Sequence, residues 1–150
     1  MSRPLYETDA DLAREGDMAS AVEKAWKCKL MKLPIRYELD YVLRREYQTV
    51  AFCEMKTKSF PYENLDRNGG YAISLGKWMT AKTMSETSML PFVLIVKLTD
   101  GLYYSTFGDG HNSFKPDDMV ISGRVDRGDW QDMEPHVIIR ANKFKKLKDS

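Results

Sequence analysis

The alternation of apolar and polar residues predicts a helix followed by a hairpin in the first 60 residues. Between residues 8 and 30, apolar or small side chains recur at a spacing close to one helical face, and Thr8 and Asp9 are available as N-caps. From residue 35 to 43 the pattern changes to a two-residue alternation, which predicts a half-buried strand. Residues 47 to 58 are rich in β-formers and predict a second strand, antiparallel to the first because the connection is short.

The rest of the chain predicts further strands around a second helix. We expect a loop over residues 59 to 70 and a helix over residues 71 to 88. The clearest strand runs from 92 to 96 and precedes a hairpin turn at Asp100-Gly101, while short strands are expected at 119 to 122 and at 136 to 139. This order indicates an α/β or α+β fold with helices packed on a sheet.

Composition bounds the kind of protein more than its function. The chain has 150 residues, 43% of them hydrophobic, which predicts a single domain over residues 1 to 150. A net charge of +1 gives no global basic field, so any nucleic-acid contact must come from local clustering. Cys28 and Cys53 lack zinc or disulfide spacing and predict free thiols in a reducing compartment. With no signal-like or membrane-spanning run, we expect a soluble cytoplasmic protein.

The chemistry concentrates on the predicted hairpin. Glu54 and Lys56 are two residues apart in a strand and therefore point to the same face. A three-residue loop over 45 to 47 would place Asp40 opposite Phe52, on the same face as Glu54 and diagonal to it. A two-residue loop would instead turn Asp40 to the other face. The site therefore depends on the parity of the hairpin.

Converging carboxylates of this kind need a positive partner. Two carboxylates on adjacent strands repel unless a cation neutralises them, and Mg²⁺ or Mn²⁺ does so through oxygen ligands. Lys56, two residues beyond Glu54, could position the attacking water and offset the charge of a phosphate. These residue types predict a metal site for phosphate chemistry at Asp40, Glu54 and Lys56.

These motifs resemble the PD-(D/E)xK nuclease superfamily over roughly residues 10 to 107. The matching segments are Leu39-Asp40-Tyr41, Cys53-Glu54-Met55-Lys56, the second helix and the strand at 92 to 96. Residues 32 to 40 and 73 to 78 are most similar to small phage-encoded nuclease-like proteins, although Leu39 stands where the signature has proline. The resemblance implies a restriction-endonuclease-like α/β core, with a central mixed sheet flanked by helices, in α-β-β-α-β order with extra C-terminal strands.

The resemblance also implies further metal ligands. Asp40 and Glu54 would hold the metal together with the main-chain carbonyl of Met55. Members often add a carboxylate from the first helix, for which we prefer Glu23 and keep Glu15 as the alternative. Glu23 would then be both a metal ligand and a catalytic residue.

A third group of candidates comes from the second helix. The family places a polar or basic residue from this helix in the site, and Lys77 and Ser74 are one turn apart there, with Tyr71 on the same predicted face. Lys77 is predicted to be catalytic, and all three residues are predicted to contact the substrate.

The function implied is a metal-dependent nuclease that hydrolyses DNA phosphodiester bonds. The alternative is a catalytically inactive nuclease-fold module that binds nucleic acid or protein, and a third reading is a small β-rich interaction module. DNA is the expected partner, and a homodimer is an open expectation because junction-cleaving relatives are dimers. If the chain is encoded by a phage, its compartment would be the host cytoplasm.

Overall fold

A computed structural model describes residues 9–33, 39–123 and 133–148. The strand predicted over 35 to 43 therefore lies partly outside the described residues. In chain order the elements are α1 (Asp9–Trp26), β1 (Lys29–Lys32), β2 (Tyr41–Arg45), β3 (Gln48–Thr57), α2 (Tyr62–Arg67), β4 (Tyr71–Ser74), α3 (Leu75–Ser88), β5 (Phe92–Leu98), β6 (Gly101–Phe107), β7 (Asp118–Gly123), β8 (Met133–Ile139), the 3-10 turn η3 (Ala141–Lys143) and β9 (Lys145–Lys146).

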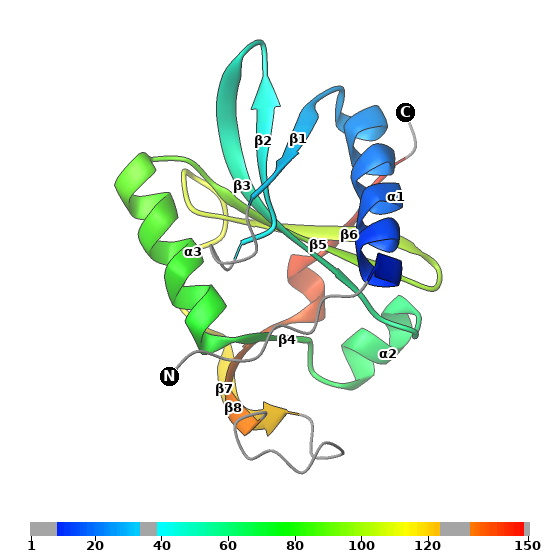
Figure 1. Ribbon diagram of the computed structural model, residues 1–150. Coiled ribbons are helices and arrows are strands. Elements are labelled where there is room, and N and C mark those ends of the chain that lie inside the picture. Colours follow the sequence, from blue (N-terminus) through cyan, green and yellow to red (C-terminus); the bar gives the residue numbers. More distant parts are fainter. Residues whose placement is uncertain (1–8, 34–38, 124–132, 149–150) are drawn as a thin grey trace.

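A mixed sheet of six strands forms the centre of the molecule. Its order is β1-β2-β3-β5-β6-β9, in which β3 and β5 are parallel and the other neighbours are antiparallel. Helix α1 lies on one side of this sheet, whereas α3 and a three-stranded sheet of order β4-β8-β7 lie on the other (Figure 1). The predicted α/β architecture, a central mixed sheet flanked by helices, is confirmed.

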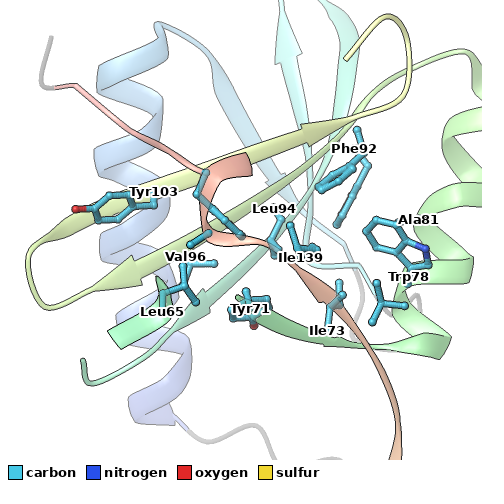
Figure 2. Close-up of a cluster of buried hydrophobic side chains, with 14 of the residues drawn as sticks. Leu65, Tyr71, Ile73, Trp78, Ala81, Phe92, Leu94, Val96, Tyr103 and Ile139 are labelled. Atoms are coloured by element: carbon cyan, nitrogen blue, oxygen red, sulfur yellow. The ribbon is translucent and has the colours of Figure 1, made fainter. Parts of the chain in front are cut away.

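The central sheet is buried on both faces, and β5 shows this most clearly. Val93 and Ile95 pack into a cluster with α1, while Leu94 and Val96 pack into a second cluster with α3 and the small sheet. Figure 2 shows this second cluster, in which Trp78 of α3 and Ile139 of β8 lie near the side chains of β5. A strand covered on both faces reads as a continuous apolar run, which is why it was the clearest strand in the sequence.

The prediction of one helix over residues 71 to 88 is wrong for its first part. Its first four residues form β4, where Tyr71 and Ile73 are buried and alternate with half-buried neighbours. They pair with Ile139 and Val137 of β8, a partner more than sixty residues away in sequence. The helix begins only at Leu75, after the side chain of Ser74 accepts a hydrogen bond from the Lys77 main-chain N–H.

Two smaller elements were also missed. The predicted loop over 59 to 70 contains the short helix α2, whose Leu65 is buried in the core. The first helix ends at Trp26, one residue before Lys27 with φ of 51°, and the next residues form β1 at the edge of the sheet. A left-handed residue directly after a helix is a common way to end it.

The C-terminal basic segment is tied to the fold. Strand β9 pairs with β6, and Phe144 is buried in the core cluster. Within the part of the chain that the structure describes, no helix has both the length and the apolar character needed to cross a membrane.

Candidate active site

The β2–β3 hairpin reaches the predicted parity by a different route. Its loop has two residues, Glu46 and Tyr47, with φ of 46° and 67°, and not the three that were expected. A shift of register then follows, since Arg44 pairs with Thr49 but Leu43 pairs with Ala51. The bulge adds one residue to β3 and so restores the parity that a two-residue loop alone would have inverted.

As a result, Asp40 comes level with Glu54 and not with Phe52 as predicted. Val42 pairs with Phe52 and Tyr41 with Cys53, so the next step along each strand brings the two acids together. The Asp40 main-chain N–H donates to Glu54 Oε2 at 3.2 Å, and the Met55 N–H donates to Asp40 Oδ2 at 3.0 Å. Each carboxylate is thus oriented by a main-chain N–H of the neighbouring strand.

Glu54 is fully buried and is surrounded by ammonium groups. Its Oε1 accepts a hydrogen bond from Lys77 Nζ and lies 3.5 Å from Lys56 Nζ, while the Glu54 side chain has no exposed area. Burial raises the pKa of Glu54 above its ordinary value; Lys77 opposes this shift, Asp40 adds to it, and Lys56 opposes it. The lysines therefore offset part of the cost of holding a carboxylate inside the protein.

Lys77 enters the site from the first turn of α3. Burial acts to lower its pKa, but the charge of Glu54 and the hydrogen bond to it outweigh burial and raise the pKa above its ordinary value. The Lys77 main-chain N–H meanwhile donates to Ser74 Oγ at 3.3 Å. Ser74 thus fixes the start of the helix that delivers Lys77, and its role as a substrate contact stays a prediction.

Tyr71 does not share a helical face with Lys77, because it lies on β4. Its side chain is 5% exposed and packs edge-on against Phe144, with ring centroids 6.3 Å apart. Burial also raises the pKa of the Tyr71 hydroxyl far above its ordinary value. The Tyr71 side chain therefore belongs to the core cluster, and its role as a substrate contact stays a prediction.

The first helix contributes Glu15 to this region, whereas the preferred Glu23 has another partner. Glu23 Oε2 accepts a hydrogen bond from the Leu30 main-chain N–H at 2.9 Å, near the end of α1. Glu15 Oε2 lies 2.6 Å from Lys32 Nζ, and the same ammonium lies 3.7 Å from Asp40 Oδ1. The structure thus brings Glu15, and not the preferred Glu23, into the chain of ion pairs that includes Asp40. Which of the two acids would bind a metal stays a prediction.

Sequence reasoning missed Lys32. Its signal was weak, because it is one of 23 Lys and Arg residues and lies outside the predicted hairpin. Only the pairing of Lys32 with Tyr41, at the edge of the sheet, brings it beside Asp40.

Comparison with known proteins identifies the family. The model of the family described as "Phage putative PDDEXK endonuclease" matches residues 1–147. The chain belongs to this family. Among solved structures it is similar to Hjc, a Holliday junction resolvase from the archaeal hyperthermophile Archaeoglobus fulgidus, at 13% identity and a TM-score of 0.48, over 62% of this chain and 69% of that one. No curated protein matches the chain.

Asp40 and Glu54 of this phage endonuclease-family chain present carboxylate oxygens of the type that a hard divalent cation binds. Asp40 and Glu54 each use one oxygen for a main-chain N–H and turn the other, Oδ1 and Oε1, toward ammonium groups. Those cation-facing oxygens are of the kind that Mg²⁺ or Mn²⁺ prefers. Within residues 9–33, 39–123 and 133–148, however, no group of three or more acidic, histidine or cysteine side chains is close enough to hold a metal. Among these residues, Asp40 and Glu54 are the two acids joined through each other's strand by main-chain hydrogen bonds.

Proposed function

We propose that this protein is a metal-dependent DNA endonuclease whose centre is built from Asp40, Glu54 and Lys56. The observation that carries the proposal is that Asp40, directly before β2, meets Glu54 of the adjacent strand β3, with Lys56 Nζ 3.5 Å from Glu54 Oε1. Membership of a PDDEXK endonuclease family supports it. Asp40 Oδ1 and a Glu54 oxygen would hold the cation, and the Met55 carbonyl is proposed as a third ligand.

The bound cation would supply a Lewis acid for the phosphate and a water of lowered pKa as nucleophile. The protein's own residues divide the remaining work. Lys56 has 44% of its side chain exposed and so can reach a phosphate or hold the attacking water. Lys77, with 27% exposed, stabilises buried Glu54 in the charged form. We therefore propose Lys56 as the catalytic lysine and Lys77 chiefly as a positioning residue.

The test separates cleavage from metal binding. Plasmid, single-stranded and branched DNA are incubated with Mg²⁺ or Mn²⁺ and with EDTA, using the wild type, Asp40→Asn, Glu54→Gln and Lys56→Met. We expect metal-dependent cleavage that falls by about a hundredfold or more in each variant. Calorimetric Mn²⁺ binding should be lost in the two acid variants and kept in Lys56→Met, because Lys56 is not a ligand.

Lys97→Met is a matched control, since Lys97 is exposed on β5 and does not belong to the cluster around Glu54. It should cleave like the wild type. Cleavage that survives Asp40→Asn and Lys56→Met would disprove the site. Absence of cleavage on every DNA substrate would favour the alternative, a nuclease-fold binding module. The expected homodimer stays a prediction.

A further inference from the structure

One lysine beside the proposed centre forms ion pairs with two carboxylates. Lys32 Nζ is 2.6 Å from Glu15 Oε2 on α1 and 3.7 Å from Asp40 Oδ1. It also lies 5.1 Å from the centre of the Tyr41 ring. The backbone holds this arrangement, because Lys32 pairs with Tyr41 and the Leu33 N–H donates to the Asp40 carbonyl at 2.7 Å.

Lys32 forms an ion pair with the Asp40 oxygen that we expect a metal to bind. Asp40 Oδ2 accepts a hydrogen bond from the Met55 N–H, whereas Oδ1 faces Lys32 at 3.7 Å and is the oxygen with more capacity for a cation. The same ammonium pairs with both Glu15 and Asp40, and within the described residues no third acid joins Asp40 and Glu54. An ammonium shared by two carboxylates from different elements stands where a divalent cation could bridge them.

We propose that Lys32 is a resident counter-cation that a divalent metal must displace, and that its departure frees Glu15 to join Asp40 and Glu54 around the metal. The inference rests on the proposed function and deepens it by assigning a residue that sets metal affinity. The lysine side chain is 35% exposed, so its ammonium has a route into solvent. The protein thus holds its acids neutralised until metal arrives.

Electrostatics sets the size of the expected effect. A single positive charge about 5 Å from a divalent ion weakens binding by about tenfold, even with the dielectric constant of water. Lys32→Met should therefore lower the calorimetric dissociation constant for Mn²⁺, measured on the full chain without DNA, by about tenfold or more. Lys32→Gln should act in the same direction, whereas Lys32→Arg, which keeps the charge, should bind like the wild type.

Two matched variants isolate the mechanism. Lys29→Met removes the same charge from an exposed position at the other end of β1, about 10 Å away by strand geometry, and should change the constant by less than about twofold because of ionic screening. Adding Glu15→Gln to Lys32→Met should abolish the gain if Glu15 is the freed ligand.

Thermal unfolding gives an independent readout. In EDTA, Lys32→Met should melt below the wild type because Glu15 and Asp40 lose their shared cation, and Mn²⁺ should raise its Tm by more than it raises that of the wild type. Equal or weaker Mn²⁺ binding by both Lys32→Met and Lys32→Gln would overturn the inference. If the wild type then still binds Mn²⁺ and cleaves DNA, the proposed function survives that result; if no chain binds Mn²⁺, both proposals fail.

Discussion

Glu54 shows how a single buried charge organises the site. Its side chain lies on the face of the central sheet that packs against α3, as does that of Leu94, its partner on the parallel strand β5. Burying a lone carboxylate is strongly unfavourable, so this residue is tolerated because Lys77 and the Asp40 N–H satisfy its oxygens. The same contacts that stabilise the buried carboxylate also fix the orientation of its two oxygens.

Asp117 is a second acid whose ionisation should matter, here for stability. Its carboxylate accepts hydrogen bonds from Lys143 Nζ at 2.7 Å and from the Arg140 N–H at 3.1 Å. Burial acts to raise its pKa, but these bonds outweigh burial and hold the pKa below its ordinary 3.8. Because the folded pKa is depressed, the stabilisation is present above about pH 4 and is lost as pH falls through the lowered value.

Asp117→Asn should therefore reduce the free energy of unfolding by about 1 kcal/mol at pH 7. The difference from the wild type should shrink toward zero below pH 3, as urea denaturation at several pH values would reveal. Asp66→Asn, at an exposed position on α2, is the control and should change the free energy of unfolding little. A difference that is constant with pH would mean that the carboxylate charge is not responsible.

At the scale of elements, the β2–β3 hairpin decides the geometry of the site. It projects beyond the body of the molecule at the top of Figure 1. Its two-residue loop requires positive φ at both positions, a conformation that suits Asn and Gly and strains Glu46 and Tyr47. Tyr47 is 95% exposed, so little packing compensates for that strain.

Replacing Glu46-Tyr47 by Asn-Gly should raise the free energy of unfolding by about 1 kcal/mol. The Arg44 guanidinium donates a hydrogen bond to the main-chain carbonyl of residue 47, and this bond can persist because it does not involve the side chain of residue 47. Thermal or urea unfolding measures the gain, and Tyr47→Ala, which removes the ring but keeps the strain, should show none. A loss of stability in the Asn-Gly variant would contradict the strain argument.

At the scale of the whole molecule, the two sheets share one core. Ile139 and Val137 of the small sheet belong to the same buried cluster as Leu94 and Val96 of the central sheet. Figure 2 shows Ile139 beside Leu94. We expect this shared core to couple the unfolding of both sheets, and the single domain stays a prediction.

Ile139→Ala should therefore destabilise the entire fold by about 3 kcal/mol, because the residue is 1% exposed and leaves a cavity. Far-ultraviolet circular dichroism and tryptophan fluorescence should give coincident urea transitions, both shifted by the same amount. Ile121→Ala, at a position 69% exposed on β7, should change little. Two separate transitions would show that the sheets unfold independently.

The sequence by itself determined what depends on local backbone geometry. Two-residue and helical periodicities predicted α1, β3, β5 and the short strands β7 and β8, and strand alternation placed Glu54 and Lys56 on one face. The family motifs and the mixed α/β class followed from the same segments, because they are continuous in the chain. Features of this kind can be predicted from neighbouring residues alone, without knowing which distant segments pack against them.

Tertiary structure alone decided what depends on partners far apart in sequence. Strand β4 exists because β8 pairs with it, and the bulge in β3 brings Asp40 level with Glu54 despite the short loop. The pairing of β1 with β2 makes Glu15, and not Glu23, the helix acid that Lys32 links to Asp40. The convergence of Asp40, Glu54 and their lysines is thus a property of register and packing, which local periodicity does not encode.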